Sequence, residues 1–156
     1  MKHAKASKKN ISCSEFTHIV HISDIHIKPL ERHDEYLKVF QSLTNKIKSF
    51  KNKHKIAIAI TGDIFDNKTV FKPETFNLCK MFMKDLSQQA PVFVIAGNHD
   101  MLETNTRRLD ALTPIVNDIP NLFYFSLSGW YKVNDYVFAV SSLYDKEITK
   151  IENKDQ

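Results

Sequence analysis

The sequence lacks the features of a disulfide-stabilised, secreted or membrane-spanning protein. Its two cysteines, Cys13 and Cys79, are too few for a disulfide framework and favour a reducing compartment. The lysines at the N-terminus are not followed by the apolar stretch of a secretory signal. No apolar run approaches the ~20 residues that a membrane span needs. We therefore expect a cytoplasmic protein without a membrane partner.

The excess of positive charge is confined to the N-terminal ten residues. The formal net charge is +4, but residues 1–10 contain four lysines and no acid, and removing them leaves 18 basic against 18 acidic residues. The body of the chain therefore lacks the basic balance that is typical of nucleic-acid-binding domains. We expect a flexible basic tail over residues 1–15, one folded domain over residues 16–145 and a charged tail over residues 146–156.

The pattern of apolar residues predicts alternating strands and helices. The expected strands lie at residues 16–22, 56–60 and 91–96. The expected helices lie at residues 33–50, from Pro73 onward, and at residues 105–116 with Thr104 or Asn105 as the cap. Such alternation predicts an α/β fold with a parallel β-α-β-α-β sheet. After a strand-like segment at residues 121–126, a β-hairpin is expected around Asn134-Asp135.

Polar groups that bind metals follow each of the three expected parallel strands. Asp24 and His26 follow the first strand, Asp63 the second, and Asn98 and His99 the third. Each motif alone is usually a turn or a helix cap. Together they meet at one sheet edge, because the carboxyl ends of parallel strands lie side by side. Carboxylate, imidazole and amide ligands suit Mn²⁺, Fe²⁺ or Zn²⁺, and two divalent cations would relieve the repulsion between the acids.

These residues carry a resemblance to a known family. Asp24-x-His26, Gly62-Asp63 and Gly97-Asn98-His99-Asp100 resemble the first three motifs of the calcineurin-like metallophosphoesterase superfamily. The stretch Gly62-Asp63-Ile64-Phe65-Asp66 resembles its DNA-repair exonuclease branch, the SbcD-like nucleases, and the surrounding sequence is most similar to SbcD-type proteins of large viruses and phages. The resemblance covers residues 16–145. It implies half of a four-layer sandwich and, for a viral chain, a location in the host cytoplasm or nucleus.

The resemblance also implies a role for each matching residue. Asp24 and His26 would hold a first metal ion, Asp63 would bridge two ions, and Asn98 would hold the second through its side-chain oxygen. Mn²⁺ is the implied metal.

Two further residues would act on the substrate. His99 would not ligate metal; it would face the scissile phosphate and stabilise charge or protonate the leaving oxygen. Asp100 would orient His99.

The sequence departs from the family pattern after Asp100. The family supplies further ligands from a later lone histidine and a Gly-x-His-x-His-like element, and no histidine follows His99 here. We therefore expect weakened metal binding, an exposed sheet face where the second sheet would pack, and either a fragment of a longer reading frame or a truncated descendant.

Three functions follow from these observations. The first is an SbcD-type DNA exonuclease or endonuclease that acts in DNA repair or recombination, with DNA as substrate, an SbcC-type ATPase subunit as the implied partner and a homodimer as an alternative assembly. The second is a phosphodiesterase or phosphatase for small substrates. The third is an inactive remnant that binds DNA or a partner protein.

Overall fold

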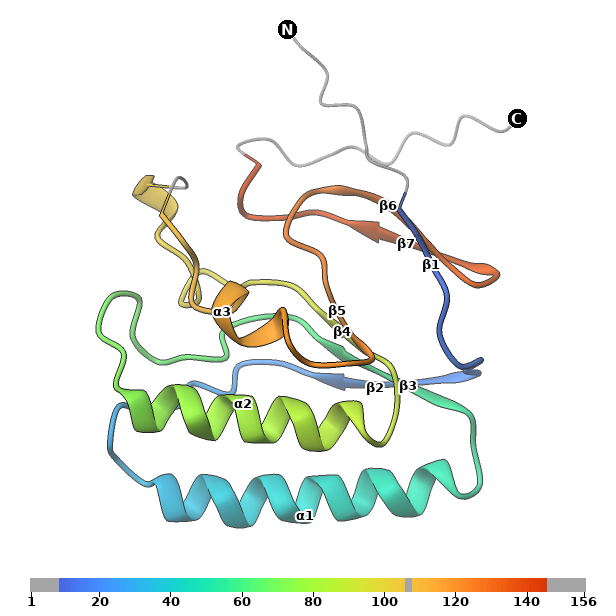
Figure 1. Ribbon diagram of the computed structural model, residues 1–156, viewed down its shortest axis with the longest axis horizontal. Helices are drawn as coiled ribbons and strands as arrows, with labels where there is room; N and C mark the ends of the chain where they lie inside the picture. The colour runs from blue at the N-terminus through green and yellow to red at the C-terminus, as the bar shows by residue number, and fades with distance from the viewer. Residues whose placement is uncertain (1–8, 106–107, 146–156) are drawn as a thin grey trace, which may run out of the picture.

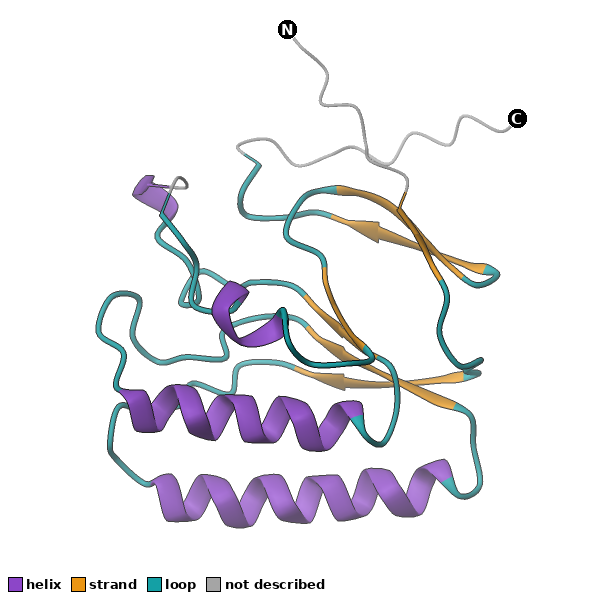
Figure 2. Ribbon diagram, viewed as in Figure 1, coloured by secondary structure: helices purple, strands orange, loops and turns teal. Residues whose placement is uncertain are grey.

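Two β-sheets and a layer of helices form the protein, as a computed structural model describes it for residues 9–105 and 108–145 (Figures 1 and 2). The larger sheet has the order β2-β3-β4-β5, and all of its neighbouring strands are parallel. Its strands are β2 (His18–Ile22), β3 (Ile56–Ile60), β4 (Val92–Val94) and β5 (Leu122–Tyr124). The smaller sheet has the order β1-β6-β7 and contains β1 (Lys9–Ile11), β6 (Gly129–Val133) and β7 (Tyr136–Val140).

Helices cover one face of the larger sheet (Figure 2). The two long helices are α1 (His33–Lys51) and α2 (Pro73–Ser87). They connect parallel strands, which places both on the same face of the sheet. Phe40 of α1 stacks on Phe82 of α2, with ring centroids 3.9 Å apart, above the buried Ile58 and Ile60 of β3. The expected α/β fold with parallel strands is confirmed, and β5 adds a fourth parallel strand to the three expected.

The smaller sheet covers the opposite face of the larger one. The β6–β7 hairpin forms as expected and packs on a second apolar cluster, in which Phe93 of β4 lies against Phe125 and Phe138. Phe93 is 3 % exposed, so this part of the face is buried. The expectation of a bare sheet face was therefore wrong at its centre, because the hairpin is itself apolar enough to cover it.

Part of the segment expected as a flexible tail over residues 1–15 forms a strand. Residues 9–11 form β1, which pairs in parallel with β6. Asn134, in the hairpin turn with φ 52°, accepts a hydrogen bond from the Cys13 backbone N–H at 3.2 Å and donates to its carbonyl at 3.1 Å. These contacts depend on residues more than 100 positions away, which is why a local pattern does not reveal them. Residues 1–8 and 146–156 lie outside the described residues.

The expected helix over residues 105–116 is also wrong. Only the short 3₁₀ helix η1 (Glu103–Asn105) and the single-turn helix α3 (Thr113–Val116) form in the described part of this segment. The N-cap position of α3 is Leu112 rather than Thr104 or Asn105. The carboxylate of Asp110, just before it, accepts from the N–H groups of Leu112 and Thr113 at 2.8 and 2.7 Å. Across the described residues, no helix combines the length and apolar character that crossing a membrane requires.

Candidate metal centre

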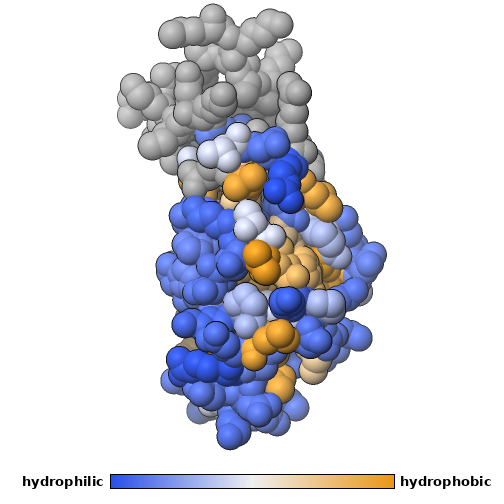
Figure 3. Space-filling model, turned by 90° about the vertical axis from the view of Figure 1, so that its left-hand side faces the viewer, coloured by the Kyte–Doolittle hydropathy of each residue, from blue (hydrophilic) through white to orange (hydrophobic). Residues whose placement is uncertain are grey.

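The six residues singled out from the sequence follow three adjacent strands. Asp24 and His26 lie beyond β2, Asp63 beyond β3, and residues 98–100 beyond β4. Because the strands are parallel, these segments meet at the carboxyl edge of the sheet, on the left in Figure 1. Figure 3, which views the molecule from that side, shows a surface that is mainly hydrophilic with small hydrophobic areas.

Asp24, His26 and Asp63 form a compact group of metal-ligand atoms. One ligand atom from each lies within 4.8 Å of the others, and Asp24 Oδ1 is 3.9 Å from His26 Nε2. Asp24 is exposed, and the other two are half-buried. All three have the left-handed backbone conformation, with φ values of 56°, 49° and 52°. Non-glycine residues adopt it rarely and at a cost, and such strain gathers at functional sites.

Backbone hydrogen bonds tie the loop after β2 to the loop after β3. The N–H of Asp24 donates to the Gly62 carbonyl at 3.2 Å, and the N–H of His26 donates to the Asp63 carbonyl at 3.0 Å. From α1, the Tyr36 hydroxyl donates to the His26 carbonyl at 2.6 Å. The ligand loops are therefore held by main-chain contacts, and Tyr36 is a supporting residue that the sequence did not single out.

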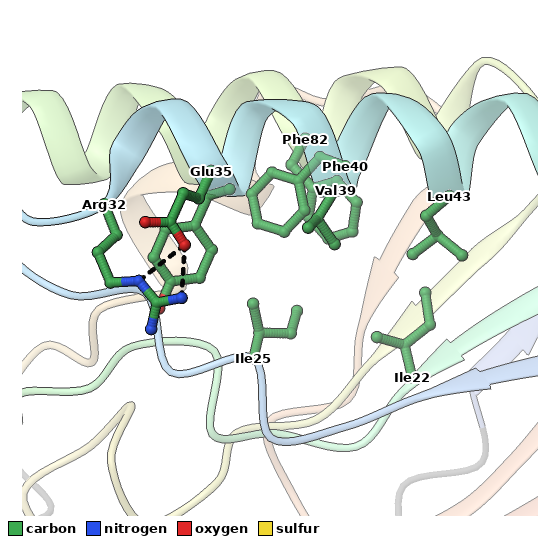
Figure 4. A pocket seen from close by; sticks show the side chains of 9 residues that line it. Ile22, Ile25, Arg32, Glu35, Val39, Phe40, Leu43 and Phe82 are labelled. Atoms are coloured by element: carbon green, nitrogen blue, oxygen red, sulfur yellow. Dashed lines mark hydrogen bonds and ion pairs between the residues drawn. The ribbon is translucent and has the colours of Figure 1, made fainter.

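An apolar hollow of about 300 Å³ lies beneath the first ligand loop. Ile25, between the two ligands Asp24 and His26, points toward α1 in Figure 4, as does Ile22 of β2. An ion pair between Arg32 and Glu35 lies at the rim of the hollow. Ile25 also packs against the main apolar cluster, and this contact anchors the loop on the side of the helices.

Two glycines allow the turns after β3 and β4 to touch. Gly62 has φ +94°, and a Cβ at this position would lie 2.3 Å from the Gly97 nitrogen. A Cβ on Gly97 would lie 2.2 Å from Asp63 Oδ1. Both distances are far below van der Waals contact. Glycine is therefore required at positions 62 and 97 for the two turns to pack this closely.

Asp63 is the centre of the polar contacts. Its Oδ1 accepts a hydrogen bond from the His99 backbone N–H at 2.9 Å. The side-chain amide of Asn98 lies beside the same carboxylate. In the orientation that satisfies both ends of that amide, its nitrogen is 3.1 Å from both Asp63 oxygens and its oxygen accepts from Lys68 Nζ at 3.2 Å. The opposite orientation, which points the Asn98 oxygen at Asp63, is the one in which that oxygen could bind a metal ion.

The imidazole of His99 is oriented by a main-chain carbonyl. Nδ1 lies 2.8 Å from the carbonyl oxygen of Asp66, and because a carbonyl can only accept, Nδ1 carries a proton. The ring stands edge-on to that of His26, with centroids 4.8 Å apart. The sequence predicts Asp100 as the residue that orients His99, whereas the side-chain contact of this imidazole is with the carbonyl of Asp66.

Asp100 instead joins the two glycine-containing turns. Its carboxylate accepts from the backbone N–H groups of Ile64 at 2.9 Å, Phe65 at 3.0 Å and Gly97 at 2.9 Å. The residue is 1 % exposed, and burial raises the pKa of its carboxyl although the three N–H donors oppose the change. Asp100 is therefore a structural brace behind the ligands, and it does not line the site.

Three of the predicted ligands form a set that could hold a divalent cation. Two carboxylates and an imidazole, which converge from two strand ends, are suitable ligands for Mn²⁺, Fe²⁺ or Zn²⁺. For a second ion, Asp63 and Asn98 are the remaining predicted ligands, and the ammonium group of Lys68 lies beside Asn98. Lys68 could not be singled out from the sequence, because a lone lysine in a loop is usually solvated.

Comparisons with known proteins found a matching family and a viral relative. The family model for calcineurin-like phosphoesterases matches residues 17–154. An uncharacterized protein of Acanthamoeba polyphaga mimivirus, R555, is 41 % identical over 140 residues, which are 88 % of this chain and 10 % of the viral protein. The chain thus spans about a tenth of the length of that relative.

Proposed function

Because the chain belongs to the calcineurin-like phosphoesterases, whose members are metal-dependent hydrolases, we propose that its strand-end site cleaves phosphodiester bonds in DNA. One observation carries the proposal: Asp24, His26 and Asp63 place their ligand atoms within 4.8 Å of one another at the carboxyl edge of the sheet. These three residues would hold a divalent cation. Such an ion activates water and neutralises charge on the phosphoryl oxygens.

His99 is the residue that would act on the leaving group. Its Nδ1–H is engaged with the Asp66 carbonyl, so the free Nε2 can donate a proton only from the imidazolium form. In that form His99 would stabilise the phosphoryl charge and protonate the departing oxygen. The hydrogen bond from its own backbone N–H to Asp63 keeps the ring beside the metal ligands.

DNA is proposed as the substrate on two grounds. The stretch from Gly62 to Asp66 resembles the SbcD-like nucleases, and Asp24 is exposed at the open edge of the sheet, where a long polymer has access. Mn²⁺ as the physiological ion, an SbcC-type ATPase partner and a homodimer are proposals that rest on the same resemblance.

The test compares a fluorescently labelled DNA duplex with a chromogenic phosphodiester, each with Mn²⁺. We expect degradation of the duplex that EDTA abolishes and that His99→Ala lowers by about 10²–10⁴-fold. His54→Ala replaces a histidine in the connection between α1 and β3, at the end of the sheet opposite the site, and should leave the rate unchanged. Cleavage of the chromogenic compound without degradation of the duplex would instead favour a small-substrate phosphodiesterase. No cleavage of either would contradict hydrolysis by this chain.

A further inference from the structure

Exposed aliphatic side chains lie on the loops that follow the three strands leading to the candidate site. Leu30 after β2 is 57 % exposed, Val70 after β3 is 50 % exposed, and Leu109 after β4 is 71 % exposed. The N–H of Ala111, two residues beyond Leu109, donates to the Asp100 carbonyl at 2.9 Å, which ties this segment to the motif after β4. Single exposed aliphatic residues are common on proteins, but here one follows each of the three strands. Figure 3, which views this edge, shows small hydrophobic areas among hydrophilic side chains.

Buried neighbours hold the first two loops in place. Ile27, three residues before Leu30, is fully buried and forms an isolated β-bridge with Phe65 of the next loop. Phe71, beside Val70, packs against the ring of Phe65, with centroids 5.2 Å apart. The apolar residues that anchor these loops are therefore Ile27, Phe65 and Phe71, while Leu30 and Val70 remain in contact with water.

The backbone of Leu30 is strained. Its φ is 58°, in the left-handed region that bulky side chains avoid. Asp24, His26 and Arg32 in the same loop share this conformation. Such strain gathers at segments that contact ligands. A strained loop that also holds an aliphatic side chain in water indicates a surface that contacts another molecule.

Cations flank the aliphatic residues at a shared spacing. In the first two loops a cation stands two residues before and two residues after the aliphatic one, in Lys28-Pro29-Leu30-Glu31-Arg32 and in Lys68-Thr69-Val70-Phe71-Lys72. The third loop contains the exposed pair Arg108-Leu109. Arg32 is engaged with Glu35 in an exposed ion pair, a kind of contact that contributes little to stability. The three loops therefore fit a partner that offers anionic groups and apolar faces together.

DNA with unpaired bases has this combination of groups. Along an intact duplex the bases are stacked inside, and the protein meets phosphates, sugars and base edges. Cations alone would serve such a contact, and exposed aliphatic side chains would bury nothing. Unpaired bases instead expose flat faces on which apolar side chains pack, and every base is joined to a phosphate.

We propose that these three loops bind a DNA strand whose bases are unpaired, with Leu30, Val70 and Leu109 against the bases and the exposed cations Lys72 and Arg108 on the phosphates. The inference rests on the proposed function for its substrate and adds the form of DNA that the site holds. An intact duplex must open at an end or a gap before its strand is held in this way.

Competition between two forms of DNA tests the proposal. Binding is measured with Ca²⁺ in place of Mn²⁺ and does not require hydrolysis, so its outcome is separate from that of the hydrolysis assay. A fluorescein-labelled single strand is displaced by an unlabelled single strand or by a relaxed, covalently closed duplex circle. We expect the single strand to compete about tenfold better per nucleotide. Equal competition, or no binding of the single strand, would overturn the proposal.

Replacement of Leu30 by asparagine separates binding from stability. Asparagine adopts the left-handed conformation more readily than leucine, so Leu30→Asn should melt no lower than the original protein. Its affinity for the single strand should fall about fivefold, as should that of Leu109→Ser. Val137→Ser, on the β6–β7 hairpin, is the matched control, because Val137 is 60 % exposed. If Leu30→Asn and Leu109→Ser bind the single strand as tightly as Val137→Ser does, the aliphatic residues do not contact DNA and the proposal is wrong.

The phosphate contacts and a lipid alternative complete the test. Lys72→Ala should weaken binding of the single strand and make it less dependent on salt, whereas Lys80→Ala, at an exposed position on α2, should match the original protein. Vesicles of phosphatidylcholine and phosphatidylserine offer anionic and apolar groups in another form. Retention of the protein on these vesicles without binding of the single strand would overturn the proposal in favour of a lipid surface.

Discussion

Replacing Asp100 with alanine removes the acceptor that three backbone N–H groups share, two of them buried and one half-buried. These groups belong to Ile64, Phe65 and Gly97, at 2.9, 3.0 and 2.9 Å from the carboxylate. A buried N–H left without a partner costs ~1–3 kcal/mol. Because water can enter part of the space left by the carboxylate, we use the lower half of this range. The three groups then predict a loss of about 3–6 kcal/mol in the free energy of unfolding.

The assay is urea unfolding followed by circular dichroism at neutral pH. Asp118→Ala removes an exposed carboxylate and should stay within about 0.5 kcal/mol of the original protein. The free energy of unfolding of Asp100→Asn should lie between those of the two alanine variants, because the amide oxygen of asparagine can still accept a hydrogen bond while its NH₂ group cannot. If Asp100→Ala is as stable as Asp118→Ala, the carboxylate does not brace the turns and the reasoning is refuted.

The same residue predicts a dependence of stability on pH. Burial raises the pKa of Asp100 above the usual range for this side chain. The part of its contribution to stability that is linked to protonation is therefore complete below the pKa of the unfolded chain, about 3.9, and is lost as the pH rises through the pKa of the folded state. The free energy of unfolding of the original protein minus that of Asp100→Asn should fall as the pH rises from about 4. A difference that rises over this interval would contradict the assigned direction.

Three further predictions concern residues around the site. Gly62→Ala should destabilise the protein by more than ~1 kcal/mol, because φ is +94° and the new Cβ would overlap the adjoining turn; an unchanged melting temperature would contradict this. Tyr36→Phe removes the hydroxyl that donates to the His26 carbonyl, and should cost about 1 kcal/mol and weaken Mn²⁺ binding severalfold in calorimetry; equal affinity would exclude Tyr36 as a support. Cys79 is fully buried and its pKa is raised, so a thiol reagent should modify the half-buried Cys13 first, and equal rates in the native protein would argue against the described core.

The convergence of the candidate metal ligands could be predicted from the sequence because their positions depend on a simple rule. Asp24, His26 and Asp63 each follow an apolar run that forms a parallel strand, and parallel strands bring their carboxyl ends together. The contact between His99 and the carbonyl of Asp66 could not be predicted in this way. A main-chain carbonyl has no signature in the sequence, and its direction depends on the conformation of the loop after β3.

Long-range packing limited the prediction in two other places. The strand Lys9–Ile11 forms by pairing with β6 of the distant hairpin. Without that partner, the local sequence has the composition of a polar tail. Asp100 follows a histidine in a motif, which favours a catalytic interpretation, yet its carboxylate turns inward toward the N–H groups of another loop. The sequence singles out Asp100 as a residue of the motif. The contacts of its carboxylate depend on how closely the two glycine-containing turns approach each other.

The most direct test of the account is Mn²⁺ binding and hydrolysis of a chromogenic phosphodiester by the original chain and by Asp63→Asn. This substitution keeps the size of the side chain and an oxygen that can accept from the His99 N–H, but removes the charge that would hold the ion. The account predicts metal-dependent hydrolysis by the original chain and a loss of about 100-fold or more in both Mn²⁺ affinity and rate for the variant. Equal Mn²⁺ affinity in the two proteins, or hydrolysis that persists in EDTA, would contradict the metal centre at the strand ends.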